Sequence, residues 1–360
     1  MTAAEPKGLL AGGAVARWPL PAFDEGEVQG EAPAALRQGT LRLGLLSNAN
    51  SGRNRRQLDR LEALAQRYPH VTHLPTGHGG EVREALAEFA RREIDVLAIN
   101  GGDGTVARVL GELLEHEPFS RRLPLALLSG GTANMTAGRL GVRGSLTRAA
   151  RRLFDWSAGR HRGACEMLSR PILRVRFADG RDNAYGMFVG AGAVIQGTEY
   201  AHRKLHARGL RDNAGLAIAV ARTLWGLSRG DCRFKRPVRL CLSLDGHAVL
   251  EEASASILLV SSLPRLFCGV RPFWGEGAGA VRTTVIGGDA EYLLRRLPRL
   301  LAGRPGTSLC AAEGFYSYTG HRLSLRLDGE LNLDGELHRV RRCHGPVTVE
   351  RGGDFTFLRL

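Results

Sequence analysis

Apolar residues in the first part of the chain form short continuous runs, and these alternate with longer stretches in which apolar positions recur every three or four residues. Short continuous runs are typical of strands buried on both faces, whereas the longer period is typical of amphipathic helices. The pattern predicts strands at 41–47, 71–75, 95–99 and 124–128, each followed by a helix. Alternation of this kind predicts a parallel, doubly wound α/β sheet.

Beyond residue 160 the pattern changes to strict alternation of apolar and polar residues. It is clearest at 173–177, 238–244 and 321–327. Asp179-Gly180 and Asp245-Gly246 follow the first two of these runs and are typical of hairpin turns. The second part is therefore predicted to be antiparallel and β-rich, like a sandwich, with helical interruptions at 200–228 and 289–302.

These patterns divide the chain into four segments. Residues 1–39 mix Gly, Ala, Pro and acidic residues without a period, which predicts a flexible extension. Residues 40–160 form the α/β domain and residues 161–345 the β-rich domain. For the C-terminal strands at 346–360, a return to the first domain is left open.

The predicted strand at 95–99 leads into Gly101-Gly-Asp-Gly-Thr105, after which a helix is expected at 105–115. Glycines let a ligand approach the backbone closely, and the free N–H groups at a helix start suit a phosphate. Asp103 beside a phosphate would be repelled unless it holds a cation or accepts a proton. The purely structural alternative is a strand-to-helix turn with an aspartate in the first helical turn.

A second glycine-rich turn, Ser129-Gly-Gly-Thr-Ala-Asn-Met-Thr-Ala137, follows the predicted strand at 124–128. In an open parallel sheet, loops at the carboxyl ends of neighbouring strands face one crevice, and ligands of such folds bind there. The two turns together therefore favour a ligand site over a purely structural role.

Four motifs in this order resemble the signature of the diacylglycerol kinase catalytic family, which includes bacterial lipid kinases and sphingosine kinases. They are Asn48-Ala-Asn-Ser-Gly52, Gly101-Gly-Asp-Gly-Thr105, Gly131-Thr-Ala-Asn134 and Leu333-Asp-Gly-Glu336. Ala49 stands where the family has proline, and Met135 stands where it has aspartate. The Gly-Gly-Asp-Gly element alone would be shared with NAD kinases and phosphofructokinases.

The resemblance implies that residues 40–160 bind ATP together with Mg²⁺. The positions that it assigns to the nucleotide are Asn48, Ser51, Gly52, Thr76, Gly101, Gly102, Gly104, Thr105, Gly131, Thr132 and Asn134. The chain has no Gly-x-x-x-x-Gly-Lys-Ser/Thr loop, so backbone N–H groups are expected to cradle the phosphates. For Thr76, the structural alternative is a helix N-cap.

The resemblance also implies that Asp103, Asp334 and Glu336 are catalytic, with one carboxylate of the last element acting as general base on the lipid hydroxyl. The same tripeptide occurs earlier as Asp328-Gly-Glu330. An Asp-Gly pair between strands is usually a hairpin turn. Because Asp328 directly follows the predicted strand at 321–327, we expect it to form the hairpin and leave the site to 334–336. The choice of base between Asp334 and Glu336 stays open.

The family has a further metal-binding element, Asp-Gly-x-Leu-Asp. The matching stretch here is Arg271-Pro-Phe-Trp-Gly-Glu-Gly-Ala-Gly-Ala280, in which Glu276-Gly277 replaces Asp-Gly and the second acid is missing. The candidate metal ligands are therefore Asp103 and Glu276.

Composition places the chain among globular proteins, because 43% of its residues are hydrophobic and none of its apolar runs reaches membrane-spanning length. The formal net charge of +14 comes almost entirely from arginine and favours anionic partners. A basic run at 203–211 precedes an apolar helical pattern, which suits either an anionic membrane surface or a solvated helix start. We expect a cytoplasmic protein, peripheral to the inner face of the membrane.

The favoured hypothesis is an ATP-dependent lipid kinase that phosphorylates a hydroxyl of diacylglycerol or a related lipid in phospholipid biosynthesis. An NAD kinase is the nearest alternative enzyme. A nucleic-acid-binding protein is the alternative from another class, but only the net charge supports it and the chain shows no interleaved aromatic stripe. No nucleic acid partner is therefore expected, and the oligomeric state is not indicated.

Overall fold

The computed structural model describes residues 29–31, 40–52, 54–77, 79–130, 140–160, 165–200, 222–223, 225–226, 237–266, 270–288, 290, 293–302 and 309–360. Most of the predicted extension at 1–39, the loop at 131–134 and the basic run at 203–211 lie outside these residues.

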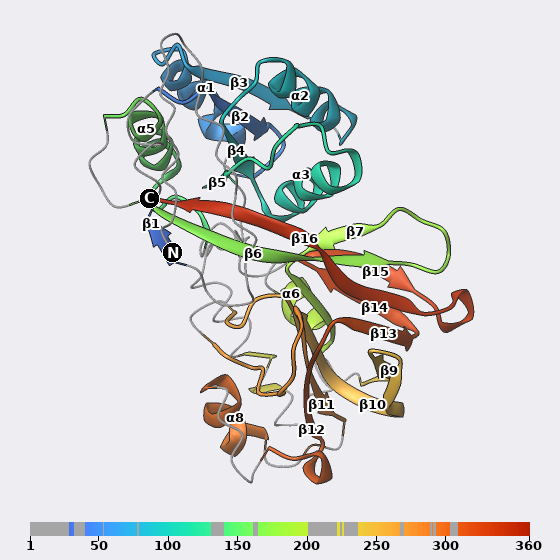
Figure 1. Ribbon diagram of the computed structural model, residues 1–360. Helices are drawn as coiled ribbons and strands as arrows, with labels where there is room; N and C mark the ends of the chain where they lie inside the picture. Colours follow the sequence, from blue (N-terminus) through green and yellow to red (C-terminus); the bar gives the residue numbers. More distant parts are fainter. Residues whose placement is uncertain are drawn as a thin grey trace, which may run out of the picture.

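The first region is built on a parallel sheet with helices on both faces (Figure 1). Its strands, in spatial order, are β3 (Val71–Thr76), β2 (Leu43–Asn48), β4 (Val96–Gly101) and β5 (Leu125–Ser129). Helices α1 (Asn54–Ala65) and α5 (Leu146–Ser157) cover one face, and α2 (Gly79–Arg91) and α3 (Asp103–His116) cover the other. The predicted doubly wound α/β fold is confirmed for this region.

The continuous apolar runs at β2, β4 and β5 have a direct structural cause, because these three strands are buried on both sides, whereas the edge strand β3 is mostly half-buried. In β4, Leu97 and Ile99 face the core beneath α2 and α3, whereas Val96 and Ala98 face the core beneath α1 and α5. All four side chains are fully buried. Successive strand residues point to opposite faces, so a strand covered on both sides has no polar position to spare.

The second region is antiparallel and β-rich, as predicted. Its elements are β6 (Glu166–Arg176), β7 (Ala184–Gly186), β8 (Phe188–Gly192), α6 (Ala193–Tyr200), β9 (Val238–Leu244), β10 (His247–Ser261), β11 (Val281–Gly287), α8 (Leu293–Ala302), β12 (Phe315–Gly320), β13 (Arg322–Leu327), β14 (Gly329–Leu333), β15 (Glu336–Val340) and β16 (Val347–Arg359). A short strand, β1 (Gln29–Glu31), pairs with β6. Leu173 and Val175 of β6 share one core with the alternating apolar residues of β9 and β13. Leu168 and Ile172 of β6 instead face the core beneath α2 and α3.

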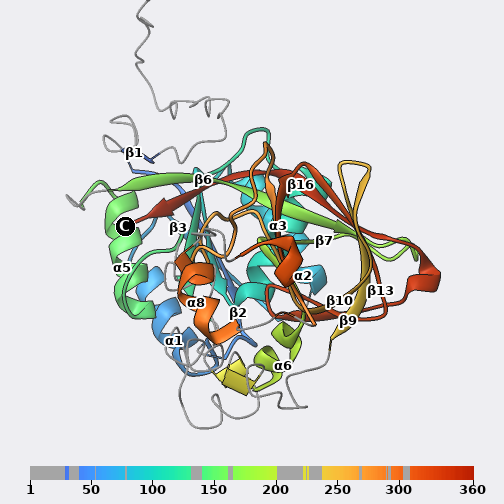
Figure 2. The same ribbon diagram turned by 90° about the horizontal axis from the view of Figure 1, so that it is seen from below.

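Two long strands connect the regions. β16 pairs with β13 at its start and lies parallel to β5 at Phe357 and Leu358, so it reaches from the antiparallel region into the parallel sheet. β6 runs antiparallel to β16 along nearly its whole length. Both views show this pair passing from α5 across to the β-rich region (Figures 1 and 2).

Three local predictions can be compared directly with the structure. The Asp179-Gly180 and Asp245-Gly246 turns do separate paired antiparallel strands, β6 from β7 and β9 from β10. Helix α3 starts at Asp103, two residues before the predicted start, so Asp103 belongs to its first turn. Thr76 is the last residue of β3 and α2 begins only at Gly79, so Thr76 is not a helix N-cap. Among the described residues, no helix has both the length and the apolar character needed to cross a membrane.

Candidate active site

The carboxyl ends of β2 and β4 are held together by side-chain hydrogen bonds. Asn48, the last residue of β2, donates from Nδ2 to Oγ1 of Thr105 in α3 at 2.8 Å. Its Oδ1 accepts the N–H of Asn50 at 2.9 Å, which closes the loop after β2. Ser51 N–H donates to the Asn48 carbonyl at 3.1 Å in the same turn, and Gly52 is exposed beside it. The first two nucleotide loops predicted from the sequence therefore lie against each other.

The loop after β3 joins this group. Asn50 Nδ2 donates to the Gly77 carbonyl at 2.8 Å, and the N–H of Ala49 donates to the Thr76 carbonyl at 2.9 Å. The Thr76 side chain is buried, and its hydroxyl points to the Ser47 carbonyl at 3.5 Å. Thr76 therefore lies at the end of β3 beside the loop after β2, with its hydroxyl directed inward.

Two buried asparagines that sequence reasoning missed lie beneath these loops. Asn54 Nδ2 donates to the carbonyls of Asn48 and Asn100 at 2.7 and 3.2 Å, and Asn100 Nδ2 donates to Ser47 Oγ at 3.0 Å. The Oδ1 atoms of Asn54 and Asn100 have no hydrogen-bond partner among the described residues. A Cβ on Gly130 would come within 2.3 Å of Asn100 Oδ1, so the backbone passes directly over these amide oxygens. An asparagine at the end of an otherwise apolar strand was the available signal.

Asp103 occupies the first turn of α3, directly after the loop that follows β4. Its side chain is buried, which disfavours the charged form of a carboxyl group. The positive end of the helix dipole at the first turn of α3 opposes this effect, because it stabilises a carboxylate. Gly101 is required at the preceding turn, because a Cβ there would lie 2.5 Å from Cβ of Thr105. The predicted members Gly101, Gly102, Asp103, Gly104 and Thr105 are thus adjacent at the start of α3.

Glu336 reaches this helix start from the other region of the molecule. It is the first residue of β15 and is exposed, and a Cβ added to Gly104 would lie 2.3 Å from its Oε1. The carboxylate therefore occupies the space that a side chain at residue 104 would need. Only glycine at this position lets Glu336 approach the first turn of α3.

Asp334 lies deeper in the same place. Its Oδ2 accepts the N–H of Met187 at 2.8 Å, and its own N–H donates to the Phe188 carbonyl at 3.0 Å. Gly186 makes room for the carboxyl group, since a Cβ there would lie 2.5 Å from Oδ2. The backbone after β7 thus forms a cradle for the side chain.

The environment of Asp334 strongly favours its protonated form. Burial, followed by the nearby charge of Asp103 and a smaller effect of Glu336, raises the pKa of Asp334 to about 7, although the hydrogen bonds from Met187 and Phe188 oppose this. Asp103 and Asp334 come from different regions of the fold, so this interaction exists only because the two regions are packed together. A carboxyl group that changes protonation state near neutral pH can exchange a proton with a substrate.

The prediction about which Asp-Gly pair forms the hairpin is wrong. Leu333 pairs with Glu336 across β14 and β15, and the two residues between them have positive φ, 45° at Asp334 and 101° at Gly335. This is the two-residue turn that Asp-Gly favours, and it lies at Asp334. The hairpin and the site are therefore the same residues, because the turn directs the aspartate inward.

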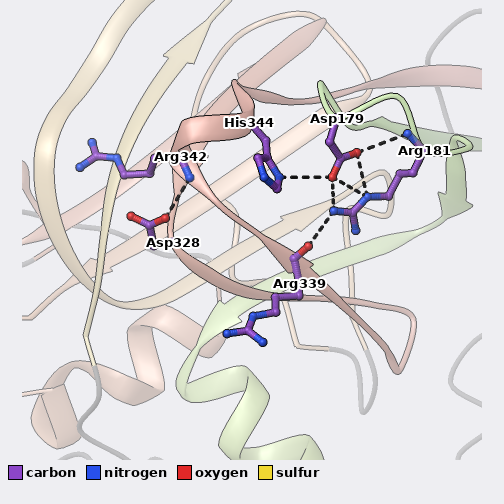
Figure 3. Close-up of polar contacts among 6 residues, drawn as sticks. All are labelled: Asp179, Arg181, Asp328, Arg339, Arg342 and His344. Carbon is purple, nitrogen blue, oxygen red and sulfur yellow. Dashed lines mark hydrogen bonds and ion pairs between the residues drawn. The ribbon is translucent and has the colours of Figure 1, made fainter.

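Asp328 instead marks a corner. β13 pairs with β9 and β16, whereas β14 pairs with β8 and β15, so the chain changes partners at residue 328. Asp328 is exposed and its Oδ1 accepts the N–H of Arg342 at 2.9 Å (Figure 3). The same view shows a separate group of ion pairs, in which Asp179 pairs with Arg181 and His344 (Figure 3).

Glu276 is not part of the group around Asp103. It is exposed, on a segment held to β12 by the N–H groups of Trp274 and Gly275, which donate to Ser317 Oγ at 3.1 and 3.0 Å. Within the described residues, no set of three or more His, Cys, Asp or Glu side chains is arranged to hold a metal. Of the remaining predicted positions, Gly131, Thr132 and Asn134 lie outside those residues.

Residues 42–160 match the diacylglycerol kinase catalytic domain. This match covers the parallel sheet, its four helices and the loops around Asp103, and it confirms the family resemblance of the three motifs that lie within it. The match to the diacylglycerol kinase catalytic domain ends before β6, so it does not include Asp334 or Glu336.

Curated relatives match over a similar stretch. A protein of Staphylococcus aureus strain MRSA252 named “Putative lipid kinase” is 25% identical over 118 residues, which is 32% of this chain and 33% of that protein. Its counterpart in strain MSSA476 is 26% identical over 109 residues. The chain thus matches about a third of the length of these relatives.

Solved structures extend the likeness of the fold to most of the chain. A crystal structure described as a “putative diacylglycerol kinase” from Bacillus anthracis superposes with a TM-score of 0.56 at 20% identity, covering 88% of this chain and 96% of that one. A second structure, of a diacylglycerol kinase from the same organism, gives 0.50 at 17% identity. The β-rich second region is therefore shared with these structures as a fold.

Proposed function

We propose that the protein is a lipid kinase, which transfers the γ-phosphate of ATP to a hydroxyl group of diacylglycerol or a related lipid. The observation that carries this proposal is the convergence of Asp103 and Asp334 from two regions of the chain. The domain match supports phosphoryl transfer as the chemistry, and the names of the relatives support a lipid as the acceptor.

Asp334 is the better candidate for the general base. Its raised pKa lies near neutral pH, where a base is present in its active form and still has appreciable affinity for a proton. Glu336 is exposed beside Gly104 and would orient the acceptor hydroxyl. Asp334 would take the hydroxyl proton on its carboxylate, which the Met187 N–H holds in place through Oδ2.

The residues at the strand ends fit a bound nucleotide. The backbone N–H groups of the first turn of α3 and the positive end of the helix dipole suit a phosphate, and the loops at 48–52 and 101–105 lie against each other there. Buried amide oxygens of Asn54 and Asn100 can accept further donors. Asp103 would hold the Mg²⁺ that accompanies the nucleotide, and this ion would neutralise phosphate charge during transfer.

The lipid acceptor requires access to a membrane, and we propose peripheral association with the cytoplasmic face of an anionic bilayer. The large arginine surplus supports this association because anionic headgroups attract basic surfaces. The basic run at 203–211, which the sequence suggests for this contact, lies outside the described residues.

The proposal can be tested with the purified full chain, γ-labelled ATP and Mg²⁺, and a panel of lipid alcohols in mixed micelles, with NAD as a parallel acceptor. We expect label in a lipid product and none in NADP. Asp103→Asn should abolish transfer and leave the fold intact, because the change removes charge but almost no volume. Label in NADP alone would replace the lipid proposal with an NAD kinase. Full activity of Asp103→Asn would remove Asp103 from the mechanism.

A further inference from the structure

Helix α3 touches both halves of the molecule, and its two ends have different partners. Its first turn carries Asp103, and its last turn carries Glu115. The helix lies directly beside β7 of the other region (Figure 1). An α-helix is stiff over this length, so a contact that fixes its last turn also restrains its first turn.

The contact at the last turn is a pair of hydrogen bonds to one carboxylate oxygen. Glu115 Oε1 accepts from the Tyr185 hydroxyl at 2.5 Å and from Asn183 Nδ2 at 2.7 Å. The hydrogen bond from Asn183, which has the largest effect, and the one from Tyr185 lower the pKa of Glu115. Burial and the adjacent carboxylate raise the pKa of Tyr185 to about 12. Glu115 therefore stays ionised and Tyr185 stays neutral throughout the neutral pH range.

The Tyr185 ring is also enclosed by two glycines. A Cβ on Gly111 of α3 would lie 3.0 Å from Cδ2 of the ring, and a Cβ on Gly352 of β16 would lie 3.1 Å from its Cε1. A larger residue at either position would push against the ring. The close approach of α3, β7 and β16 is thus built around this tyrosine.

The strand that carries Tyr185 also forms the cradle of Asp334. Gly186 follows Tyr185 and leaves space for Asp334 Oδ2, and Met187 donates its N–H to the same oxygen. Two residues of extended chain span only about 7 Å. The attachment point of α3 and the support of Asp334 therefore move together.

From this arrangement we infer that Tyr185 and Glu115 are positioning residues, which lock α3 to β7 and so set the separation between Asp103 and Asp334. This inference rests on the proposed function for its effect on catalysis, but the separation itself can be measured without activity. The contact between the two residues lies at the last turn of α3, at the opposite end of the helix from Asp103. Each acts through the element that it holds.

The test removes the phenol and keeps the ring. In Tyr185→Phe we expect kcat to fall about tenfold with KM for ATP nearly unchanged, since misplacement of reacting groups by a fraction of an ångström is costly. The groups that face Asp334 are Asp103 from α3, Glu336 from β15 and the backbone of Met187 and Phe188. If Asp103 moves away, the pKa of Asp334 in the metal-free protein falls, and the pH profile of its ionisation shifts to lower pH.

The chain offers a matched control. The Tyr68 hydroxyl donates to Asp155 Oδ1 at 2.7 Å within the first region, a similar phenol–carboxylate pair away from β7. Tyr68→Phe should leave kcat and the pH profile unchanged, even if it lowers the melting temperature as much as Tyr185→Phe. Glu115→Gln keeps an oxygen that can accept both bonds and should retain most activity, whereas Glu115→Ala should behave like Tyr185→Phe.

A second readout separates this inference from the kinase proposal. Aspartate labelled with ¹³C at Cγ allows the carboxyl titration of Asp334 to be followed by NMR, with its signal assigned by its loss in Asp334→Asn. A lower pKa for Asp334 in Tyr185→Phe but not in Tyr68→Phe supports positioning, even if no lipid is phosphorylated. An unchanged Asp334 titration in Tyr185→Phe, or an equal change in the control, overturns the inference whatever the activity.

Discussion

The two Asp-Gly-Glu copies have identical chemistry and opposite surroundings. Asp328 is exposed at a corner between two strands, with one hydrogen bond from the Arg342 backbone. Asp334 is buried in a hairpin turn, and its pKa is raised to about 7. Since the tripeptides are the same, everything that distinguishes them comes from the elements that the fold places around each copy.

The comparison shows how a fold assigns chemistry to a common turn sequence. A hairpin turn with positive φ at both central residues projects Asp334 toward β7 and β8 and leaves Glu336 at the start of the next strand. The carboxyl group then meets a backbone cradle at Met187 and a second carboxylate at Asp103. The earlier copy meets neither, because the chain leaves one strand pair for another at that point.

The largest expected difference between the copies is in turnover. Asp334→Asn combined with Glu336→Gln should reduce kcat by a factor of about 10² to 10⁴, the usual contribution of a positioned general base, with little change in ATP binding. Asp328→Asn combined with Glu330→Gln should remain active, because surface changes away from special features rarely matter. Lipid kinase assays and ATP titrations of both double variants would measure this.

The reverse pattern would assign the catalytic role to 328–330 and leave the buried carboxyl group without a function. If both double variants kept wild-type turnover, neither copy would take part in the reaction. A melting curve for each variant excludes loss of the fold as the cause.

The second difference concerns stability as a function of pH. Asp334 has a pKa of about 7 in the folded protein and about 3.9 when unfolded, so the folded state binds more protons between these values and loses stability as pH rises through them. Asp334→Asn removes this cost, and its amide oxygen can still accept the Met187 N–H. We expect the variant to be more stable than wild type at pH 8, by an amount on the order of a few kcal/mol, and similar to wild type near pH 4.

Asp328→Asn is the control for this measurement, since its carboxylate is exposed. Its stability difference from wild type should stay within about 0.5 kcal/mol over the same pH range. Chemical denaturation at pH 4, 6 and 8 is a suitable measurement. If the difference in the free energy of unfolding between Asp334→Asn and wild type did not change with pH, ionisation of the buried carboxyl group would not destabilise the folded state.

Local patterns in the sequence were sufficient for much of the fold. The run at 238–244 coincides with β9, and the run at 71–75 is one residue shorter than β3. These strands could be predicted because the spacing of apolar residues depends on whether one or both faces of a strand are buried. The loop residues around Asp103 were found in the same way. Helix α3 starts two residues early because Asp103 itself suits a first helical turn.

Other parts of the site depend on contacts between residues far apart in the chain. Nothing near residue 334 shows that its turn packs against Met187, and the local rule for Asp-Gly turns selected the wrong copy. The Tyr185 contact with Glu115 and the buried amides of Asn54 and Asn100 were missed for the same reason. In retrospect, Gly104 and Gly186 mark two of these contacts, since each is small where a carboxylate approaches.

Two glycines, Gly104 beside Glu336 and Gly329 in the earlier Asp-Gly-Glu copy, give the smallest predicted effect. They also separate an effect on kcat most clearly from an effect on stability. In Gly104→Ala the new Cβ would lie 2.3 Å from Glu336 Oε1, so the exposed Glu336 side chain must move away from the start of α3. We expect kcat to fall several-fold while stability is unchanged or higher by up to about 1 kcal/mol, because alanine favours a helix more than glycine. Steady-state kinetics with thermal melting would record both.

Gly329→Ala in the other copy should show the opposite combination. Its added Cβ would have only Leu327 Cδ1 nearby, at 3.9 Å, but its φ of 147° is strained for any residue with a side chain. The variant should therefore lose about 1 kcal/mol of stability and keep its turnover.

Combining Gly104→Ala with Glu336→Gln completes the test, because a glycine that acts only by admitting Glu336 has no further effect once that carboxylate is gone. Additive losses of kcat would show instead that residue 104 affects the start of α3 independently of Glu336.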